Sequence, residues 1–139
     1  IPHGGSAKLK QGNRWGQNDG LEVCLRDENN LAVGKRSPTF VLQGFTGGQS
    51  QGAGHPEEDF EKETKAAGAQ SKYAAVLSDT VWTCEWAIPI EALGIKYTAG
   101  MRLQFNIGVR RTDPDDWLAL AGAMGANFQL DNAAVLVLE

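Results

Sequence analysis

Short runs in which apolar and polar residues alternate recur along the chain, and turn-forming residues separate them. Alternation with a period of two is typical of strands that bury one face. The pattern predicts strands over Leu21–Arg26, Thr39–Phe45, Lys72–Leu77, Val81–Pro89, Met101–Arg111, Leu118–Ala121 and Ala134–Leu138. These strands follow one another at short spacing, with no strand–helix–strand rhythm. We therefore expect an all-β fold, built as an antiparallel β-sandwich.

Alternate residues of the fourth predicted strand form a strongly apolar face, namely Trp82, Cys84, Trp86 and Ile88. Two indole rings and an isoleucine on one face are most simply explained as core. The same argument assigns Leu103, Phe105 and Ile107 to the core. Pro89 ends its strand, because proline cannot donate a hydrogen bond to a central ladder.

The segment 47–70 breaks this pattern, since it consists mainly of Gly, Gln, Ala and charged residues. Within it, Pro56–Lys65 predicts a short helix with acids early and lysines late, as the helix dipole favours. A lid over a site is one interpretation of 47–70, but its composition favours a solvated polar insertion. Further on, Glu91–Gly94 predicts one helical turn that ends at its glycine.

Length and charge limit the classes of protein to consider. The 139 residues are enough for one domain, 1–139, with 1–14 as a leading segment. A net charge of −4 argues against a nucleic-acid partner, which requires a basic face. Every apolar stretch falls short of the ~18 residues that a membrane span needs, so no membrane partner is expected.

The two cysteines, Cys24 and Cys84, each lie in the middle of a predicted strand. An even count permits one disulfide, but only if the two strands are neighbours. Both could equally be small buried apolar residues. Neither has a nearby basic residue that would mark a nucleophilic thiolate.

A tryptophan, Trp15, precedes the first predicted strand in a loop of small and polar residues. Such a ring has few apolar neighbours in the sequence, which favours a surface contact. The segments Trp15–Leu25, Trp82–Gly94, Leu103–Ile107 and Val135–Leu138, taken in this order, resemble the family 9 carbohydrate-binding modules. Those modules are β-sandwiches of jelly-roll or immunoglobulin-like type, related to the DOMON-like group. The resemblance implies a non-catalytic module that binds a glycan and is not an enzyme.

The resemblance also implies a site in which aromatic rings stack on a sugar while amide and carboxylate groups bind its hydroxyls. Trp15 matches the first stacking aromatic of the family, and Phe128 is the best match for the second. Glu22 matches the carboxylate of the first conserved strand, and Gln43 stands on the strand where the family has a basic side chain. Arg111 could supply the missing donor. The expected ligand-binding residues are Trp15, Glu22, Gln43, Arg111, Trp117, Asn127 and Phe128.

Two acidic turns contain the hard oxygen ligands that calcium prefers. The candidate ligands are Asp27, Asn29, Asp113 and Asp115. Neither turn has the spacing of an EF-hand loop, so a structural Ca²⁺ is implied mainly by the resemblance. The two histidines, His3 and His55, are too far apart in the sequence to suggest a zinc or copper site.

Family members carry further strands before the segment that matches Trp15, and residues 1–14 contain no such strands. A sandwich without them would leave long unpaired edges, which soluble proteins avoid. We therefore expect another chain or an N-terminal fragment to cover that edge. The family context places the protein outside the cell or in the periplasm.

Other functions remain open at this stage. A DOMON-type redox or haem domain would need axial ligands, for which Met101, Met124 and His55 are the candidates. A hydrolase would need two facing carboxylates, for which Glu22 and Glu85 are the candidates. A structural or interaction domain of a larger extracellular protein is the third alternative.

Overall fold

The computed structural model describes residues 1–2, 8–28, 37–54, 61–121 and 126–139. Strands dominate these residues and α1 is their one α-helix, which confirms the all-β prediction. The strands are β1 Gly20–Asp27, β2 Phe40–Phe45, β3 Ser50–Ala53, β4 Lys72–Leu77, β5 Trp82–Ala87, β6 Arg102–Thr112, β7 Asp115–Ala119 and β8 Ala134–Val137. The helices are α1 Glu61–Gln70 and two short 3₁₀ turns, η3 Ile90–Leu93 and η4 Leu130–Asn132.

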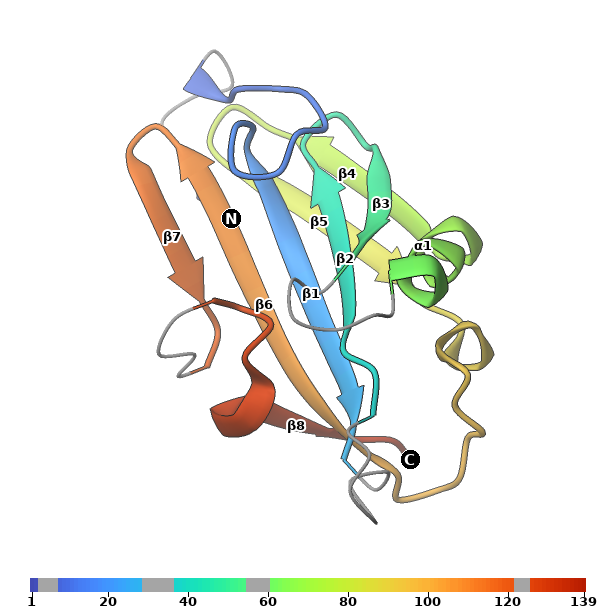
Figure 1. Cartoon of the computed structure of the whole chain (residues 1–139). Helices are drawn as coiled ribbons and strands as arrows, with labels where there is room; N and C mark the ends of the chain where they lie inside the picture. Colours follow the sequence, from blue (N-terminus) through green and yellow to red (C-terminus); the bar gives the residue numbers. More distant parts are fainter. Residues whose placement is uncertain (3–7, 29–36, 55–60, 122–125) are drawn as a thin grey trace.

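The strands form two antiparallel layers (Figure 1). The main sheet has the order β3–β2–β1–β6–β7, and β8 pairs with the opposite end of β6 from β7. The β4–β5 hairpin is the second layer and lies behind the main sheet in Figure 1. The hairpin buries its apolar face against one side of the main sheet, as the alternation of its residues predicted.

Strand β1 lies at the centre of the main sheet and is buried on both faces. Leu21, Val23 and Leu25 point toward the hairpin and join the main core. Glu22 and Cys24 point to the opposite face, where η4 and the residues before it cover the sheet. This two-sided burial places polar side chains inside the protein, and the candidate site is built from them.

Within the segment 47–70, the described residues form β3, which pairs with β2 at the edge of the main sheet, and α1, which packs on β3. The described helix spans Glu61–Gln70 and so continues five residues past the predicted end at Lys65, whereas residues 55–60 lie outside the described residues. Its contact with β3 is made by backbone. A Cβ on Gly52 would lie 1.9 Å from the Thr64 carbonyl oxygen, and one on Gly68 would lie 2.3 Å from the Gly52 nitrogen. Packing through glycine leaves no hydrophobic pattern in the sequence.

Strand β7 begins at Asp115, three residues before the predicted start at Leu118. Two consecutive aspartates argue against a strand on propensity alone. Here Asp115 pairs with Arg110 and Asp116 with Arg111 on the neighbouring strand, and these cross-strand ion pairs offset that preference. The predicted turn at Glu91–Gly94 is confirmed, with Gly94 in the left-handed region at φ 66°.

The two cysteines are free thiols, so the disulfide interpretation is wrong. Cys24 faces away from the hairpin and packs with Val41 and Leu130, whereas Cys84 belongs to the hairpin and packs into the main core. The body of the main sheet separates them. Burial raises the pKa of the Cys24 thiol well above its ordinary value, and burial also raises that of Cys84.

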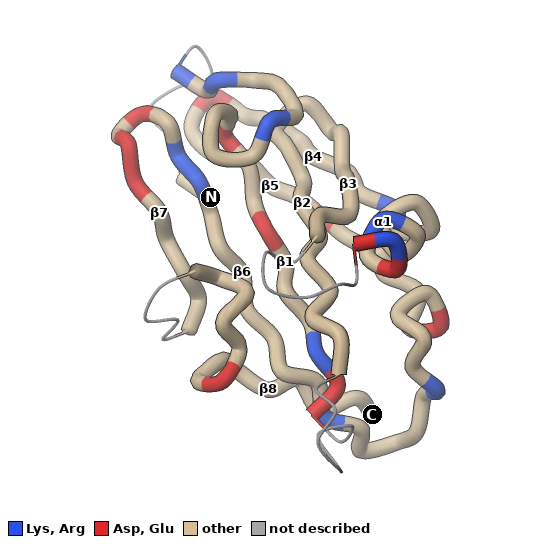
Figure 2. The backbone as a smooth tube through the Cα atoms, in the orientation of Figure 1, with Lys and Arg blue, Asp and Glu red and all other residues tan. Residues whose placement is uncertain are grey.

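Charged residues gather at the ends of the strands and on α1 (Figure 2). Among the described residues, no helix is long and apolar enough to cross a membrane.

We predict that Gly68→Ala destabilises the protein. Alanine is the better helix former by about 1 kcal/mol. However, its methyl group would overlap the β3 backbone, and overpacking typically costs about 1–3 kcal/mol. Urea denaturation measures the net loss. The control is Ala66→Gly, at an exposed position of the same helix, where a loss of up to about 1 kcal/mol is expected from propensity alone. An increase in stability for Gly68→Ala would contradict the close contact between α1 and β3.

We further predict that a thiol reagent modifies both cysteines in denaturant without prior reduction. In the folded protein at pH 8 both thiols should react slowly, because their raised pKa values disfavour the reactive thiolate. Cys24 should be the slower of the two, since its side chain is fully buried. Detection of no thiol before reduction would reinstate the disulfide.

Candidate functional site

A hollow of about 510 Å³ opens on the face of the main sheet opposite the hairpin. Six of the seven residues expected to bind a ligand line it, although they come from five separate parts of the chain. They are Trp15, Glu22, Gln43, Trp117, Asn127 and Phe128. Val41, Gly108 and Ala119 contribute apolar surface to the same lining. The structure thus assembles almost the whole predicted set into one pocket.

The loop that carries Trp15 is held rigidly by side chains on both sides of it. Asn18 accepts a hydrogen bond from the Arg14 backbone nitrogen (2.9 Å) and donates one to the Gln11 carbonyl oxygen (2.9 Å). The buried Asp19 carboxylate accepts hydrogen bonds from the Lys10 nitrogen (2.5 Å) and from the nitrogen (2.9 Å) and hydroxyl (2.7 Å) of Thr112. Trp15 is therefore presented from a preorganised loop.

Trp15 and Trp117 form an aromatic pair at the rim of the pocket. Their ring centroids are 5.5 Å apart with an interplanar angle of 69°, an edge-to-face arrangement. Trp15 is half-buried, whereas Trp117 is 57% exposed. Gly16, in the left-handed region at φ 78°, lets the backbone turn close to the Trp117 ring. The pair offers a broad aromatic surface to solvent at the pocket.

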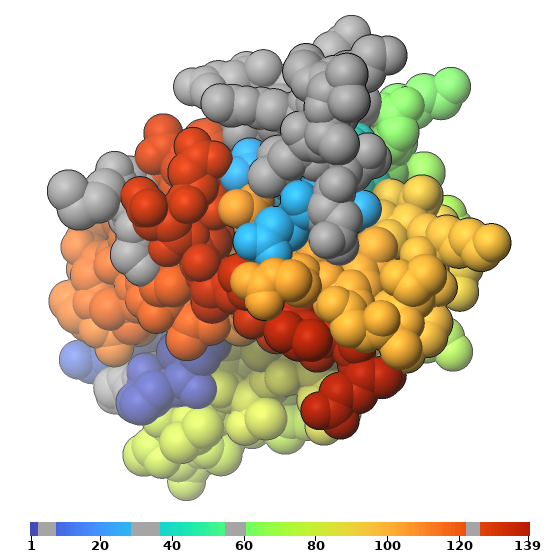
Figure 3. All heavy atoms as spheres, turned by 90° about the horizontal axis from the view of Figure 1, so that it is seen from below, coloured from blue at the N-terminus to red at the C-terminus, as the bar shows by residue number. Residues whose placement is uncertain are grey.

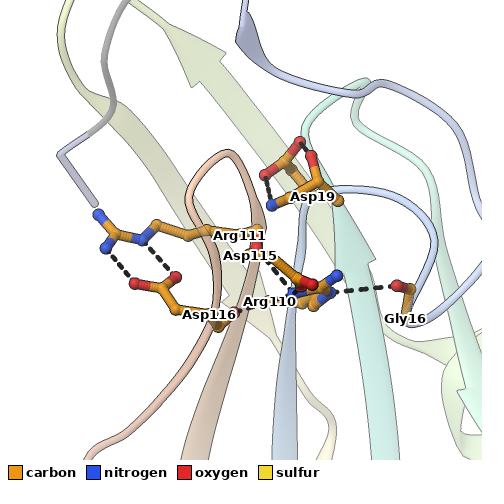
Figure 4. A network of polar contacts seen from close by, with 7 residues as sticks. Gly16, Asp19, Arg110, Arg111, Asp115 and Asp116 are labelled. Atoms are coloured by element: carbon orange, nitrogen blue, oxygen red, sulfur yellow. Dashed lines mark hydrogen bonds and ion pairs between the residues drawn. The ribbon is translucent and has the colours of Figure 1, made fainter.

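Arg110 contacts this aromatic pair and also takes part in the network of polar contacts shown in Figure 4. Its guanidinium carbon lies 4.9 Å from the Trp117 ring centroid, a cation–π distance. The same group donates to the carbonyl oxygens of Gly16 (3.1 Å), Arg111 (2.8 Å) and Asp116 (3.2 Å) and forms an ion pair with Asp115. Arg110 therefore links the Trp15 loop, β6 and β7.

Arg111, the predicted donor, does not line the pocket. It forms a two-pronged ion pair with Asp116 instead, and these hydrogen bonds lower the pKa of the Asp116 carboxyl. The expectation for Arg111 fails because successive residues of a strand point to opposite faces of the sheet. Leu103, Phe105 and Ile107 face the hairpin, so even-numbered residues of β6 lie on the opposite face, where Gly108 lines the pocket and Arg110 contacts Trp117 without lining it.

The floor of the pocket is a chain of hydrogen-bonded polar groups. Gln43 Nε2 donates to Glu22 Oε2 (2.8 Å), and Gln51 Nε2 donates to Gln43 Oε1 (2.9 Å). Glu22 and Gln43 are directly opposite on paired strands, which brings them together. Gln51, on β3, was not expected from the sequence, because it lies in the segment interpreted as an insertion.

Asn127 completes the floor from the loop before β8. Its Nδ2 donates to the Glu22 carbonyl oxygen (3.1 Å), with Glu22 Oε1 (3.4 Å) and Cys24 Sγ (3.3 Å) close by. Because Glu22 offers only acceptors, the amide must turn its nitrogen toward it. The buried Asn127 Oδ1 has no hydrogen-bond partner in the described part of the chain.

Asn127 reaches this position because residue 108, opposite Glu22 on β6, is a glycine. A Cβ there would lie 2.9 Å from Asn127 Cγ. Phe128 also lines the pocket and packs against the small cluster of Cys24, Val41 and Leu130. It is thus a wall of the pocket that is partly anchored in core.

The candidate calcium ligands lie at opposite ends of the main sheet. Asp27 pairs with Leu103 at one end of β6, whereas Asp113 and Asp115 lie at the β6–β7 turn at the other. Asp113 is ion-paired with Lys8 (3.7 Å) and Asp115 with Arg110. Asn29 lies outside the described residues, and within those residues no three potential ligands are placed to hold a metal. Calcium binding stays a prediction.

The candidate residues for two other functions are not brought together. Glu22 faces the pocket, whereas Glu85 is exposed on the hairpin beyond the other face of the sheet, so they cannot act as a facing pair. Met101 is buried near the main core. Met124 and His55, the other candidate haem ligands, lie outside the described residues.

Comparisons with models of known protein families, with curated proteins and with solved structures found no significant match. The resemblance to the family 9 carbohydrate-binding modules therefore stays a hypothesis.

We predict that Arg110→Ala loosens the aromatic pair. The loss of a buried guanidinium leaves carbonyl oxygens of Gly16, Arg111 and Asp116 without their donor, which should cost about 1–3 kcal/mol of unfolding free energy. The near-ultraviolet circular dichroism of tryptophan should also weaken, because Trp117 loses its fixed neighbour. Arg111→Ala is the matched control and should leave the tryptophan signal intact. An unchanged signal in Arg110→Ala would show that other contacts hold the rings.

Proposed function

We propose that this protein binds a sugar ring in the pocket at Trp15 and Trp117, as a non-catalytic carbohydrate-binding module. The observation that carries the proposal is the combination of an exposed indole surface with a floor of linked amides and a carboxylate. A pyranose has both properties in complementary form: a face of C–H groups and an edge of hydroxyls.

The aromatic part of the site suits the C–H face of a sugar. Indole rings cover a large area at low entropic cost, because only two side-chain torsions must be held. The Trp15 loop and Arg110 hold the rings before a ligand arrives. Such preorganisation lowers the cost of binding.

The polar floor suits the hydroxyl edge. Asn127 lines the pocket and can bond one hydroxyl through its side-chain amide. Gln43 and Gln51 hold the Glu22 carboxylate in a defined orientation. Hydrogen-bonding groups that are buried and fixed discriminate strongly against ligands that leave them unpaired. The site should therefore distinguish sugars by the stereochemistry of their hydroxyls.

Binding without turnover is part of the proposal. Hydrolysis of a glycoside generally requires a second carboxylate several ångströms from the first. Glu22 is instead held among amides, and the partner considered from the sequence, Glu85, lies beyond the other face of the sheet. A glycan-binding role suits a protein that acts outside the cell or in the periplasm, on poly- or oligosaccharides.

We predict that Trp117→Ala lowers the affinity for the bound oligosaccharide by about thirtyfold or more. Loss of a stacking aromatic at a binding site costs about 2 kcal/mol or more. The midpoint of thermal unfolding should fall little, because most of the Trp117 side chain is exposed. A glycan array identifies the ligand, and calorimetric titration measures the affinity of both proteins.

Tyr97→Ala is the control, since Tyr97 is an aromatic that is 45% exposed but lies outside the pocket. It should bind the oligosaccharide as tightly as the unmodified protein. Equal affinity for Trp117→Ala and the unmodified protein would place the sugar elsewhere. The absence of any binding on the array would overturn the proposed function itself.

A further inference from the structure

A row of polar side chains crosses three neighbouring strands at the floor of the pocket. Gln51 on β3 is directly opposite Gln43 on β2, which in turn is directly opposite Glu22 on β1. Residues directly opposite each other on paired strands point to the same face of the sheet. The three side chains therefore share the pocket face. Figure 3 shows the molecule from below, with the yellow-green hairpin on one side of the sheet and the orange-red residues before β8 on the other, pocket side.

The hydrogen bonds along this row run in one direction. A carboxylate offers only acceptors, whereas a glutamine amide offers donors on its nitrogen and an acceptor on its oxygen. Gln43 therefore turns Nε2 toward Glu22 Oε2 (2.8 Å), and its Oε1 points the other way, toward β3. There Oε1 accepts a hydrogen bond from Gln51 Nε2 (2.9 Å). The donor at Gln51 and the acceptor at Glu22 together favour a single orientation of the Gln43 amide.

Gln51 differs from its two partners in its position relative to the pocket. Glu22 and Gln43 are buried and line the pocket, whereas Gln51 is exposed and is not part of the lining. A ligand in the pocket meets Glu22 and Gln43 directly, and Gln51 acts on it through Gln43. A Gln43 amide turned the other way would set its oxygen against the carboxylate oxygens, and buried acceptors that face one another without a donor are costly.

Helix α1 holds β3, and with it Gln51, in place. β3 is the edge strand of the main sheet, so β2 is its one neighbour in that sheet. A Cβ on Gly68 of α1 would lie 2.3 Å from the Gly52 nitrogen and 3.1 Å from the Gln51 carbonyl carbon. The helix and strand backbones are therefore in close contact at Gln51. The segment 47–70 thus supplies one end of the polar row.

We propose that Gln51 is a positioning residue for sugar binding: its hydrogen bond fixes the Gln43 amide, which in turn fixes the Glu22 carboxylate as an acceptor for a ligand hydroxyl. This inference rests on the proposed function and adds to it a residue that sets the affinity from outside the pocket. A polar group held in one orientation discriminates between ligands that match it and ligands that leave it unpaired. Gln51 therefore also contributes to the choice among sugars that differ in hydroxyl stereochemistry.

The test is a series of three substitutions that separates hydrogen-bond donation from size and charge. Gln51→Lys retains donors, Gln51→Met has neither donors nor an amide oxygen, and Gln51→Glu has only acceptors at neutral pH. Because the Gln51 side chain is exposed, the three variants should unfold at nearly the same temperature as the unmodified protein. Ser50→Lys and Ser50→Glu are the matched controls. They place the same charges one residue away, on the opposite face of β3.

The first measurement needs no ligand. Nuclear magnetic resonance follows the exchange of the Gln43 side-chain amide protons with water, which the hydrogen bond to Glu22 slows. Exchange should be about three- to tenfold faster in Gln51→Met and Gln51→Glu, as expected for the loss of one hydrogen bond. Gln51→Lys and both Ser50 variants should match the unmodified protein.

The second measurement is calorimetric titration with the neutral oligosaccharide that a glycan array identifies. Affinity should fall by about three- to tenfold in Gln51→Met and Gln51→Glu and stay unchanged in Gln51→Lys. An equal loss in all three variants would overturn the inference, because it would show packing rather than donation. No loss in any variant, or the same loss in Ser50→Glu, would also overturn it.

Failure of the proposed function would look different. In that case the unmodified protein binds no glycan on the array, whatever the Gln51 variants do. The exchange of the Gln43 amide then still decides the role of Gln51 in orienting the floor. Faster exchange in Gln51→Met and Gln51→Glu alone would uphold that role, and equal exchange in all variants would overturn it.

Discussion

The central constraint in this structure is the burial of β1 on both faces. One face carries Leu21, Val23 and Leu25 into an apolar core, which alternation alone explains. The other carries Glu22 and Arg26, and a buried polar group is costly unless it is hydrogen-bonded. The groups that pack on this second face therefore supply the hydrogen bonds that Glu22 and Arg26 require.

Buried polar side chains along this face of β1 and β6 are likewise hydrogen-bonded to the segments that cover the sheet. Arg26 donates to Gln104 (2.6 Å) and Asp131 (2.8 Å), which anchors η4. Asn106 bonds both backbone groups of Ala121 (3.2 and 3.3 Å). Arg110 holds the Trp15 loop in the same way. These bonds fix the segments that rise above the sheet, and the space left between them is the pocket.

Part of the site could be predicted because its chemistry is local. Trp15 stands in a polar loop, and the phase of Glu22 opposes that of its apolar neighbours. Both features are readable in a short window of sequence. Gln51 was missed because its strand has almost no apolar residue, and its place depends on Gly52 and Gly68 allowing backbone contact. Arg111 was expected at the site but pairs with Asp116 on β7, a cross-strand contact that a short window of sequence does not reveal.

The sequence by itself determined every described strand except β3, together with their apolar faces and the antiparallel class, because a period of two and its turn residues act over a few positions. Together with the resemblance it suggests, it also indicated half of the residues that line the pocket. The tertiary structure alone decided which polar residues share one face, since that depends on the register between strands far apart in the chain. It likewise separated Cys24 from Cys84 and Glu22 from Glu85. In both pairs the two residues lie in different sheets. A local sequence pattern does not predict which face of a sheet a distant strand covers.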